Sequence, residues 1–119
     1  MRHRVLVVED DFLVALTTMD VLESIGCKIV GPVARLATAI QLVQSESLDA
    51  AILDINISGE MIWPVAEELQ RRDVPFIFLS AYPMLSVVPK FFATVARLEK
   101  PLEKNRLVNH LRAIWSHER

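Results

Sequence analysis

The chain has 119 residues, of which 52% are apolar and 24% are charged, and its formal net charge is −2. This composition excludes a disordered chain and predicts a hydrophobic core within one domain, which we expect to span residues 1–119. The near balance of acidic and basic residues gives no electrostatic basis for binding nucleic acid. Cys27 is the single cysteine, which excludes an internal disulfide. We expect it to be a small core residue in a reducing compartment.

One segment has the length and apolar character of a membrane span. Between Val74 and Val95, Lys90 is the only charged residue. Pro75, Pro83 and Pro89 interrupt this segment, and each proline removes a helical hydrogen bond. At the N-terminus, too few apolar residues precede Glu9 for a signal peptide. We therefore expect a soluble cytoplasmic domain.

Short apolar runs rich in β-branched residues alternate with longer segments of mixed polarity. Runs of this length and composition are typical of strands buried on both faces of a parallel sheet. They predict five strands, at Val5–Val8, Ile29–Val33, Ala50–Leu53, Phe76–Leu79 and Thr94–Leu98.

The intervening segments have helical spacing. The first helix is expected from Asp11 or Phe12 to Ile25, with an acidic N-cap and Gly26 at its end. Pro64 suits the first turn of the third helix. The remaining segments predict helices at Leu36–Ser45, Trp63–Arg72, Met84–Phe92 and Glu103–Trp115.

Five alternating strand and helix units predict an α/β fold, a parallel sheet with helices on both faces. In such open sheets, ligands bind outside the carboxyl ends of the strands. Polar residues follow four of the five runs at this edge. They are Glu9-Asp10-Asp11 after the first run, Asp54 after the third, Ser80 after the fourth and Lys100-Pro101 after the fifth.

These residues form a chemically coherent set. Clustered carboxylates repel one another unless a cation compensates, so Glu9, Asp10 and Asp54 indicate a site for a hard divalent ion, Mg²⁺. A backbone carbonyl at Asn56 suits the same ion. A carboxylate at Asp54 can attack a phosphoryl group and become an aspartyl phosphate. Lys100 and the hydroxyl of Ser80 would then contact the phosphoryl oxygens.

Four separated motifs resemble the receiver domain of two-component response regulators. They are Val5-Leu6-Val7-Val8-Glu9-Asp10, Ile52-Leu53-Asp54-Ile55-Asn56, Leu79-Ser80-Ala81 and Lys100-Pro101. The resemblance covers essentially the whole chain and implies a flavodoxin-like, doubly wound five-stranded parallel sheet of strand order 2-1-3-4-5. Residues 58–66 and 78–82 also resemble stand-alone receivers common in alphaproteobacteria.

The resemblance also assigns roles to residues. It implies that Asp54 is the phosphoacceptor, Asp10 a direct Mg²⁺ ligand and Glu9 an outer-shell acid. The carbonyl of Asn56 would be the third protein ligand. Ser80 would be the switch hydroxyl and Lys100 the phosphate partner, with a cis Lys100–Pro101 bond.

The chain departs from the receiver pattern at two places. The switch aromatic usually lies three residues before the lysine, and that position here is Arg97. Either Tyr82 or Arg97 could serve instead. Phe91-Phe92-Ala93-Thr94 stands where a Gly-Ala pair is often found. These departures concern the coupling of phosphorylation to output and leave the phosphorylation chemistry intact.

Other residues have simpler interpretations. His3, His110 and His117 do not form a metal site, and we interpret the last two as surface residues. The stretch around the expected fourth helix is more apolar than one buried helix face requires. We expect part of it to be an exposed patch for a partner or a homodimer. Its apolar residues are Met84, Leu85, Val87, Val88, Phe91 and Phe92.

The sequence therefore predicts a single-domain response regulator, not an enzyme in its own right. It would accept a phosphoryl group on Asp54 from a histidine kinase or histidine phosphotransfer protein and signal through protein contacts or phosphorelay. A haloacid-dehalogenase phosphohydrolase needs a second aspartate two residues after the nucleophile, where this chain has Asn56. A mononucleotide binder needs phosphate loops richer in glycine. A receiver-like interaction module that is not phosphorylated in the cell is the remaining alternative.

Overall fold

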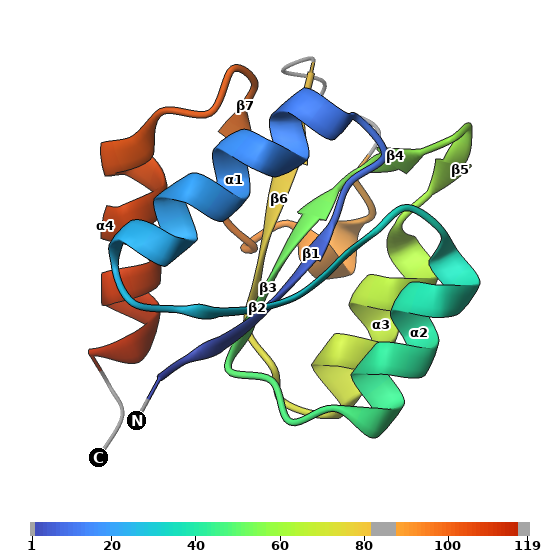
Figure 1. Ribbon diagram of the computed structural model, residues 1–119. Helices are drawn as coiled ribbons and strands as arrows, with labels where there is room; N and C mark the ends of the chain where they lie inside the picture. Colours follow the sequence, from blue (N-terminus) through green and yellow to red (C-terminus); the bar gives the residue numbers. More distant parts are fainter. Residues whose placement is uncertain (1, 82–87, 117–119) are drawn as a thin grey trace.

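The computed structural model describes residues 2–81 and 88–116. Its main strands are β1 (Arg4–Val8), β2 (Lys28–Val33), β3 (Ala50–Asp54), β6 (Phe76–Ser80) and β7 (Arg97–Glu99). Its α-helices are α1 (Phe12–Ser24), α2 (Leu36–Ser45), α3 (Trp63–Arg71) and α4 (Lys104–Trp115) (Figure 1). Two further strands, β4 (Asn56–Ile57) and β5 (Glu60–Met61), form an antiparallel pair of their own.

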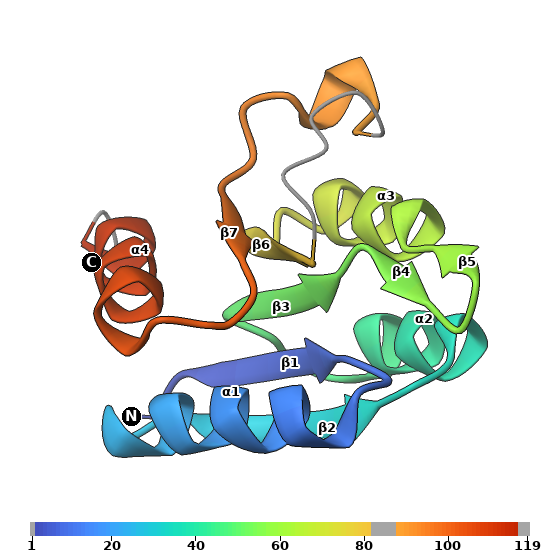
Figure 2. The ribbon, with the colours of Figure 1, turned by 90° about the horizontal axis from the view of Figure 1, so that it is seen from above.

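The five main strands form one parallel sheet of order β2-β1-β3-β6-β7. Numbered among themselves, these strands follow the order 2-1-3-4-5, so the expected flavodoxin-like fold is confirmed. Helices α1 and α4 cover one face of the sheet, and α2 and α3 cover the other (Figure 2). This doubly wound arrangement buries both faces of the central strands.

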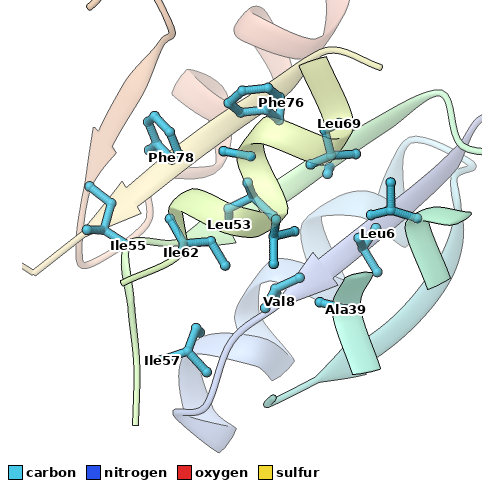
Figure 3. Packing of buried hydrophobic residues seen from close by; sticks show 14 of the residues in the cluster. Leu6, Val8, Ala39, Leu53, Ile55, Ile57, Ile62, Leu69, Phe76 and Phe78 are labelled. Atoms are coloured by element: carbon cyan, nitrogen blue, oxygen red, sulfur yellow. The ribbon is translucent and has the colours of Figure 1, made fainter. Parts of the chain in front are cut away.

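Alternation along the strands divides the core into two layers. Leu6 and Val8 of β1 point to the side of α2 and α3, whereas Val5 and Val7 point to the side of α1 and α4. Figure 3 shows the first layer, which includes Leu53 of β3 and Phe78 of β6. The ring of Phe78 packs edge-on against that of Trp63 in α3. Burying one such side chain contributes about 1.5–3 kcal/mol, so this packing fixes which residues of each strand face each layer.

The first helix follows its expected capping signals. The carboxylate of Asp11 accepts hydrogen bonds from the backbone N–H groups of Leu13 (2.9 Å) and Val14 (3.2 Å). Beyond the C-cap residue Ile25, Gly26 has a φ of 83°, a left-handed conformation that favours glycine. Cys27 is buried, as expected.

The fifth strand is shorter and later than the interval Thr94–Leu98 predicts. It comprises Arg97–Glu99, because the N–H of Val95 bonds to the carbonyl of Phe92 and closes a turn. Pairing with β6 begins only at the carbonyl of Ala96, which accepts from Phe78.

The expected helix at Met84–Phe92 falls largely on residues 82–87, outside the described residues. Its described end is a 3-10 turn, Lys90–Phe92, instead of an α-helix. Pro89 precedes this turn, and a proline cannot continue the helical ladder. Of the expected apolar patch, Phe92 is fully buried, Val88 packs against the core, and Phe91 is 66% exposed. Met84, Leu85 and Val87 lie outside the described residues.

Among residues 2–81 and 88–116, no helix is long and apolar enough to cross a membrane. The segment Val74–Val95 contains strand β6 and the 3-10 turn, separated by the residues that the structure does not describe.

Candidate functional site

The carboxyl ends of four parallel strands bring the predicted polar residues to one edge of the sheet. Glu9 and Asp10 follow β1, Asp54 is the last residue of β3, and Ser80 ends β6. Lys100 follows β7, and its backbone N–H donates to the carbonyl of Ser80 at 2.8 Å. Since β1, β3, β6 and β7 are successive neighbours, these chain positions converge on the edge that the sequence predicts.

Three carboxylates gather at this edge. Each of Glu9, Asp10 and Asp54 offers one oxygen, and these oxygens all lie within 4.8 Å of one another. Glu9 and Asp54 are 4% and 6% exposed, whereas Asp10 is exposed. The edge therefore combines two buried acids with one that solvent can reach.

Backbone N–H groups hold each carboxylate in place. The N–H of Asp11 donates to Oε2 of Glu9 at 3.1 Å, and that of Asn56 donates to Oδ1 of Asp54 at 3.3 Å. Oδ2 of Asp10 accepts from the N–H of Ser58 at 2.8 Å and from its hydroxyl at 3.3 Å. The positions of the acids are thus set by the backbone of two loops.

Lys100 supplies the positive charge. Its Nζ lies 3.0 Å from Oδ2 of Asp54 and 3.2 Å from the carboxylate of Glu9. Its side chain is only 16% exposed, so these contacts are partly shielded from solvent. One ammonium group therefore bridges the two buried acids.

The electrostatic environment differs among these groups. Burial raises the pKa of Glu9 from 4.5 to about 7, with further contributions from hydrogen bonding to Asp54 and from its charge. Burial acts in the same direction on Asp10, but hydrogen bonds from Ser58 outweigh it and lower the pKa of Asp10. Burial acts to lower the pKa of Lys100, yet the hydrogen bond and charge of Asp54, together with Glu9, raise it.

The residues present fit a hard divalent cation. Oε1 of Glu9 is buried and accepts no hydrogen bond within the described part of the chain, and Nζ of Lys100 lies 3.2 Å from it. A buried carboxylate oxygen without a hydrogen bond is costly, and a second cation or a water would satisfy it further. Three carboxylates with one lysine leave excess negative charge, which oxygen-seeking Mg²⁺ would neutralise.

Three further predicted features of the site fall within the described residues. Asn56 belongs to β4, and its side-chain Oδ1 accepts from the N–H of Gly59 at 2.9 Å. The Lys100–Pro101 bond is cis, as the receiver resemblance implies. Arg97 lies on β7 in register with Phe78, two residues before the strand end. Tyr82 lies outside the described residues.

Sequence reasoning missed Ser58 and the small hairpin that carries it. Ser58 and Gly59 join β4 to β5, and both have positive φ, 51° and 86°. Two residues with positive φ are typical of a tight hairpin turn, and a Ser-Gly pair is a sequence signal for one. The hairpin brings the N–H of Ser58 to Asp10, 48 residues earlier in the chain.

The fold and the acid-lysine cluster define a signalling receiver module. The sequence model of the response regulator receiver domain family matches residues 5–112, and the chain belongs to this family. Receiver domains are generally signalling modules and not enzymes, and they bind Mg²⁺ at an acidic pocket.

Solved structures support the same assignment. The chain is 36% identical to SdrG from Sphingomonas melonis Fr1, with a TM-score of 0.84, covering 95% of this chain and 96% of that one. A response regulator from Chloroflexus aurantiacus is 25% identical, with a TM-score of 0.86 and coverage of 98% and 100%. The receiver domain of PhyR from Erythrobacter litoralis, 24% identical with a TM-score of 0.86 and coverage of 98% and 92%, shares the fold. Among curated proteins, no significant match was found.

Proposed function

We propose that this receiver domain accepts a phosphoryl group on Asp54 from the phosphohistidine of a sensor kinase or phosphotransfer protein. The observation that carries the proposal is the placement of Asp54. It is buried at a strand end, 3.0 Å from the ammonium of Lys100 and clustered with Glu9 and Asp10. A carboxylate held in this way is poised as a nucleophile.

The proposed transfer is a displacement at phosphorus. A carboxylate oxygen of Asp54 attacks the phosphorus as the bond between phosphorus and the donor imidazole nitrogen breaks. The bonding electrons pass to that nitrogen, and because the second ring nitrogen of the reacting phosphohistidine carries a proton, the ring leaves as neutral imidazole. The product is an acyl phosphate on Asp54. Lys100 would stabilise the negative charge of the phosphoryl oxygens, and Ser80 would donate its hydroxyl to one of them.

The acidic residues would hold the cation. Asp10, Asp54 and the carbonyl of Asn56 would be ligands of Mg²⁺, with Glu9 acting through water. When bound, Mg²⁺ neutralises charge between the carboxylates and the incoming phosphoryl group. The backbone N–H of Ser58 would keep Asp10 oriented, since it donates to Oδ2 of that carboxylate.

The first turns of α1 provide a docking surface for the phosphodonor protein. Phe12, Leu13 and Leu16 are 73%, 71% and 39% exposed, which is unusual for large apolar side chains in a cluster. They directly follow Asp10 and Asp11, so the surface is continuous with the phosphorylation site. A kinase or phosphotransfer helix that docks here would present its histidine to Asp54.

Output would then run through protein contacts or phosphorelay. We propose that phosphorylation changes the arrangement of the chain after Ser80 and of the adjoining surface toward β7, with Tyr82 or Arg97 as the residue that couples the two. Residues 1–119 would act as one receiver unit in this scheme.

The test is intact mass after incubation with acetyl phosphate, with and without Mg²⁺. Wild-type protein should gain one phosphoryl group only when Mg²⁺ is present. Asp54→Asn should gain none, whereas Asp20→Asn, which alters an exposed aspartate of α1, should behave as wild type. A gain that persists in Asp54→Asn would place the acceptor elsewhere. No gain from acetyl phosphate or from a phosphorylated histidine donor would favour the non-phosphorylated interaction module.

A further inference from the structure

The outer edge of β7 has backbone groups available for another strand. Among residues 2–81 and 88–116, β7 is the last strand of the sheet and pairs with β6 alone (Figure 2). The N–H of Phe78 donates to the carbonyl of Ala96, and the N–H of Lys100 donates to the carbonyl of Ser80. Since alternate residues of a parallel strand bond to a given neighbour, the N–H and C=O groups of Arg97 and Glu99 point away from β6, and no described residue pairs with them.

The side chains on this edge have a self-complementary charge pattern. Leu98 is buried on the face covered by α1 and α4. Arg97 and Glu99, one residue to either side, therefore share the opposite face. Arg97 is half-buried and Glu99 is exposed. Within the described part of the chain, neither side chain has an ion pair.

Antiparallel pairing of two such strands about Leu98 would place Arg97 opposite Glu99 of the second copy, and Glu99 opposite its Arg97. The outward-pointing backbone groups of these two residue pairs would form four hydrogen bonds. Directly opposite side chains lie about 4.5–5.5 Å apart at Cβ, a distance at which opposite charges attract. The same two-fold axis relates both contacts, as a closed dimer requires.

The other edge of the sheet does not offer this opportunity. On β2, Pro32 has no N–H to donate, and the register with β1 shifts between Leu6 and Val8. Interruptions and prolines of this kind protect an edge strand from pairing. β7 contains no proline and keeps a regular register with β6.

The surface beside β7 provides apolar area for the same contact. A groove of about 600 Å³ runs past the start of the strand, between the end of α3 and α4. Its apolar lining includes Val74, Val95 and Ile114, and His110 contributes a polar group. A second strand on the β7 edge would cover part of this groove.

We propose that two copies of this chain associate through antiparallel pairing of β7, joining their sheets across a two-fold axis. The contact involves only three residues of each strand, so association should be weak and should depend strongly on protein concentration. It differs from the apolar patch expected at Met84–Phe92 and does not depend on phosphorylation of Asp54.

Charge reversal tests the pairing by sedimentation velocity over a range of concentrations. Wild-type protein should show concentration-dependent dimers, whereas Arg97→Glu alone and Glu99→Arg alone should each sediment as monomers because like charges would face each other. An equimolar mixture of the two variants should recover at least the wild-type dimer fraction. Only pairing between chains predicts this recovery, since contacts within one chain are not restored by mixing.

Amide hydrogen exchange provides a second measurement. Exchange at Arg97 and Glu99 should slow as wild-type concentration rises, while Leu98, which bonds to β6, should show no concentration dependence. Circular dichroism would verify that each variant is folded. A wild-type protein that stays monomeric at all concentrations, or dimers that both single variants retain, would overturn the proposal.

Discussion

The carboxylates and the lysine of the site are positioned by different means. Backbone N–H groups of Asp11, Asn56 and Ser58 hold the carboxylates of Glu9, Asp54 and Asp10. The ammonium of Lys100, in contrast, is held by the side chains of Glu9 and Asp54.

The position of Lys100 should therefore depend on the carboxylates, whereas the positions of the carboxylates should not depend on Lys100. Loss of Lys100 should leave the carboxylates near their present positions, because the loops that hold them do not use it. Loss of either buried carboxylate should release Lys100. The backbone therefore preorganises the three carboxylates, and the carboxylates in turn position the ammonium of Lys100.

The largest effect is expected on removing the lysine. Lys100→Met leaves two buried carboxylates without their cation, and breaking such a pair costs about 3 kcal/mol or more. Urea unfolding at pH 8 in EDTA should show this loss. The same variant should bind Mg²⁺ more tightly by calorimetry, since its carboxylates stay in place while a competing charge is gone.

Lys104→Met, which alters an exposed lysine of α4, is the matched control and should change neither quantity. Weaker Mg²⁺ binding in Lys100→Met would mean that the lysine positions the carboxylates, and that the backbone N–H groups alone do not hold them.

A pH-dependent effect is expected at Glu9. Its pKa rises from 4.5 to about 7 in the fold, so the folded protein retains a proton between these values that the unfolded chain has released. The contribution of Glu9 to stability is therefore most favourable below pH 4.5 and is lost as the pH rises to about 7. At 1.36 kcal/mol per pKa unit, a rise of about 2.5 units amounts to roughly 3 kcal/mol.

Glu9→Gln removes this dependence and keeps the size of the side chain. In EDTA, the variant should be more stable than wild type at pH 8, and the difference should shrink toward pH 4.5. Urea unfolding of both proteins across this range measures it. A difference that stays constant with pH would mean that the pKa of Glu9 is not raised.

The residues that hold the site differ in how far the sequence could predict their positions. The carboxylates lie at strand ends, and buried β-branched runs such as Val5–Val8 mark those ends locally. Glu9, Asp10 and Asp54 could therefore be placed at one edge before any contact was known. The hairpin that carries Ser58 could not be placed this way, because each of its strands has two residues and its contact with Asp10 spans 48 positions.

The region around β7 was harder to predict for a related reason. Thr94 and Val95 are β-branched and suit a strand, but the N–H of Val95 bonds to Phe92 in a turn. Local preference was overridden there by the 3-10 turn after Pro89. The pairing partner of Lys100 was predictable only from the order of the strands, which places β7 next to β6.

The smallest effect on stability is expected at Asp11, whose side chain caps α1 and does not hold the other carboxylates of the site. Asp11 caps α1 through its side chain, but the group it provides to Glu9 is its backbone N–H. Asp11→Ala should therefore lower stability by about 1 kcal/mol, the usual cost of a lost N-cap, while leaving the amide that holds Glu9 in place. Thermal unfolding measures the loss, and Asp20→Ala, which removes the same charge from the exposed face of α1, should not reproduce it. Phosphorylation by acetyl phosphate should proceed in Asp11→Ala as in wild type. A large decrease in phosphorylation would show that the side chain of Asp11, and not only its amide, organises the carboxylates.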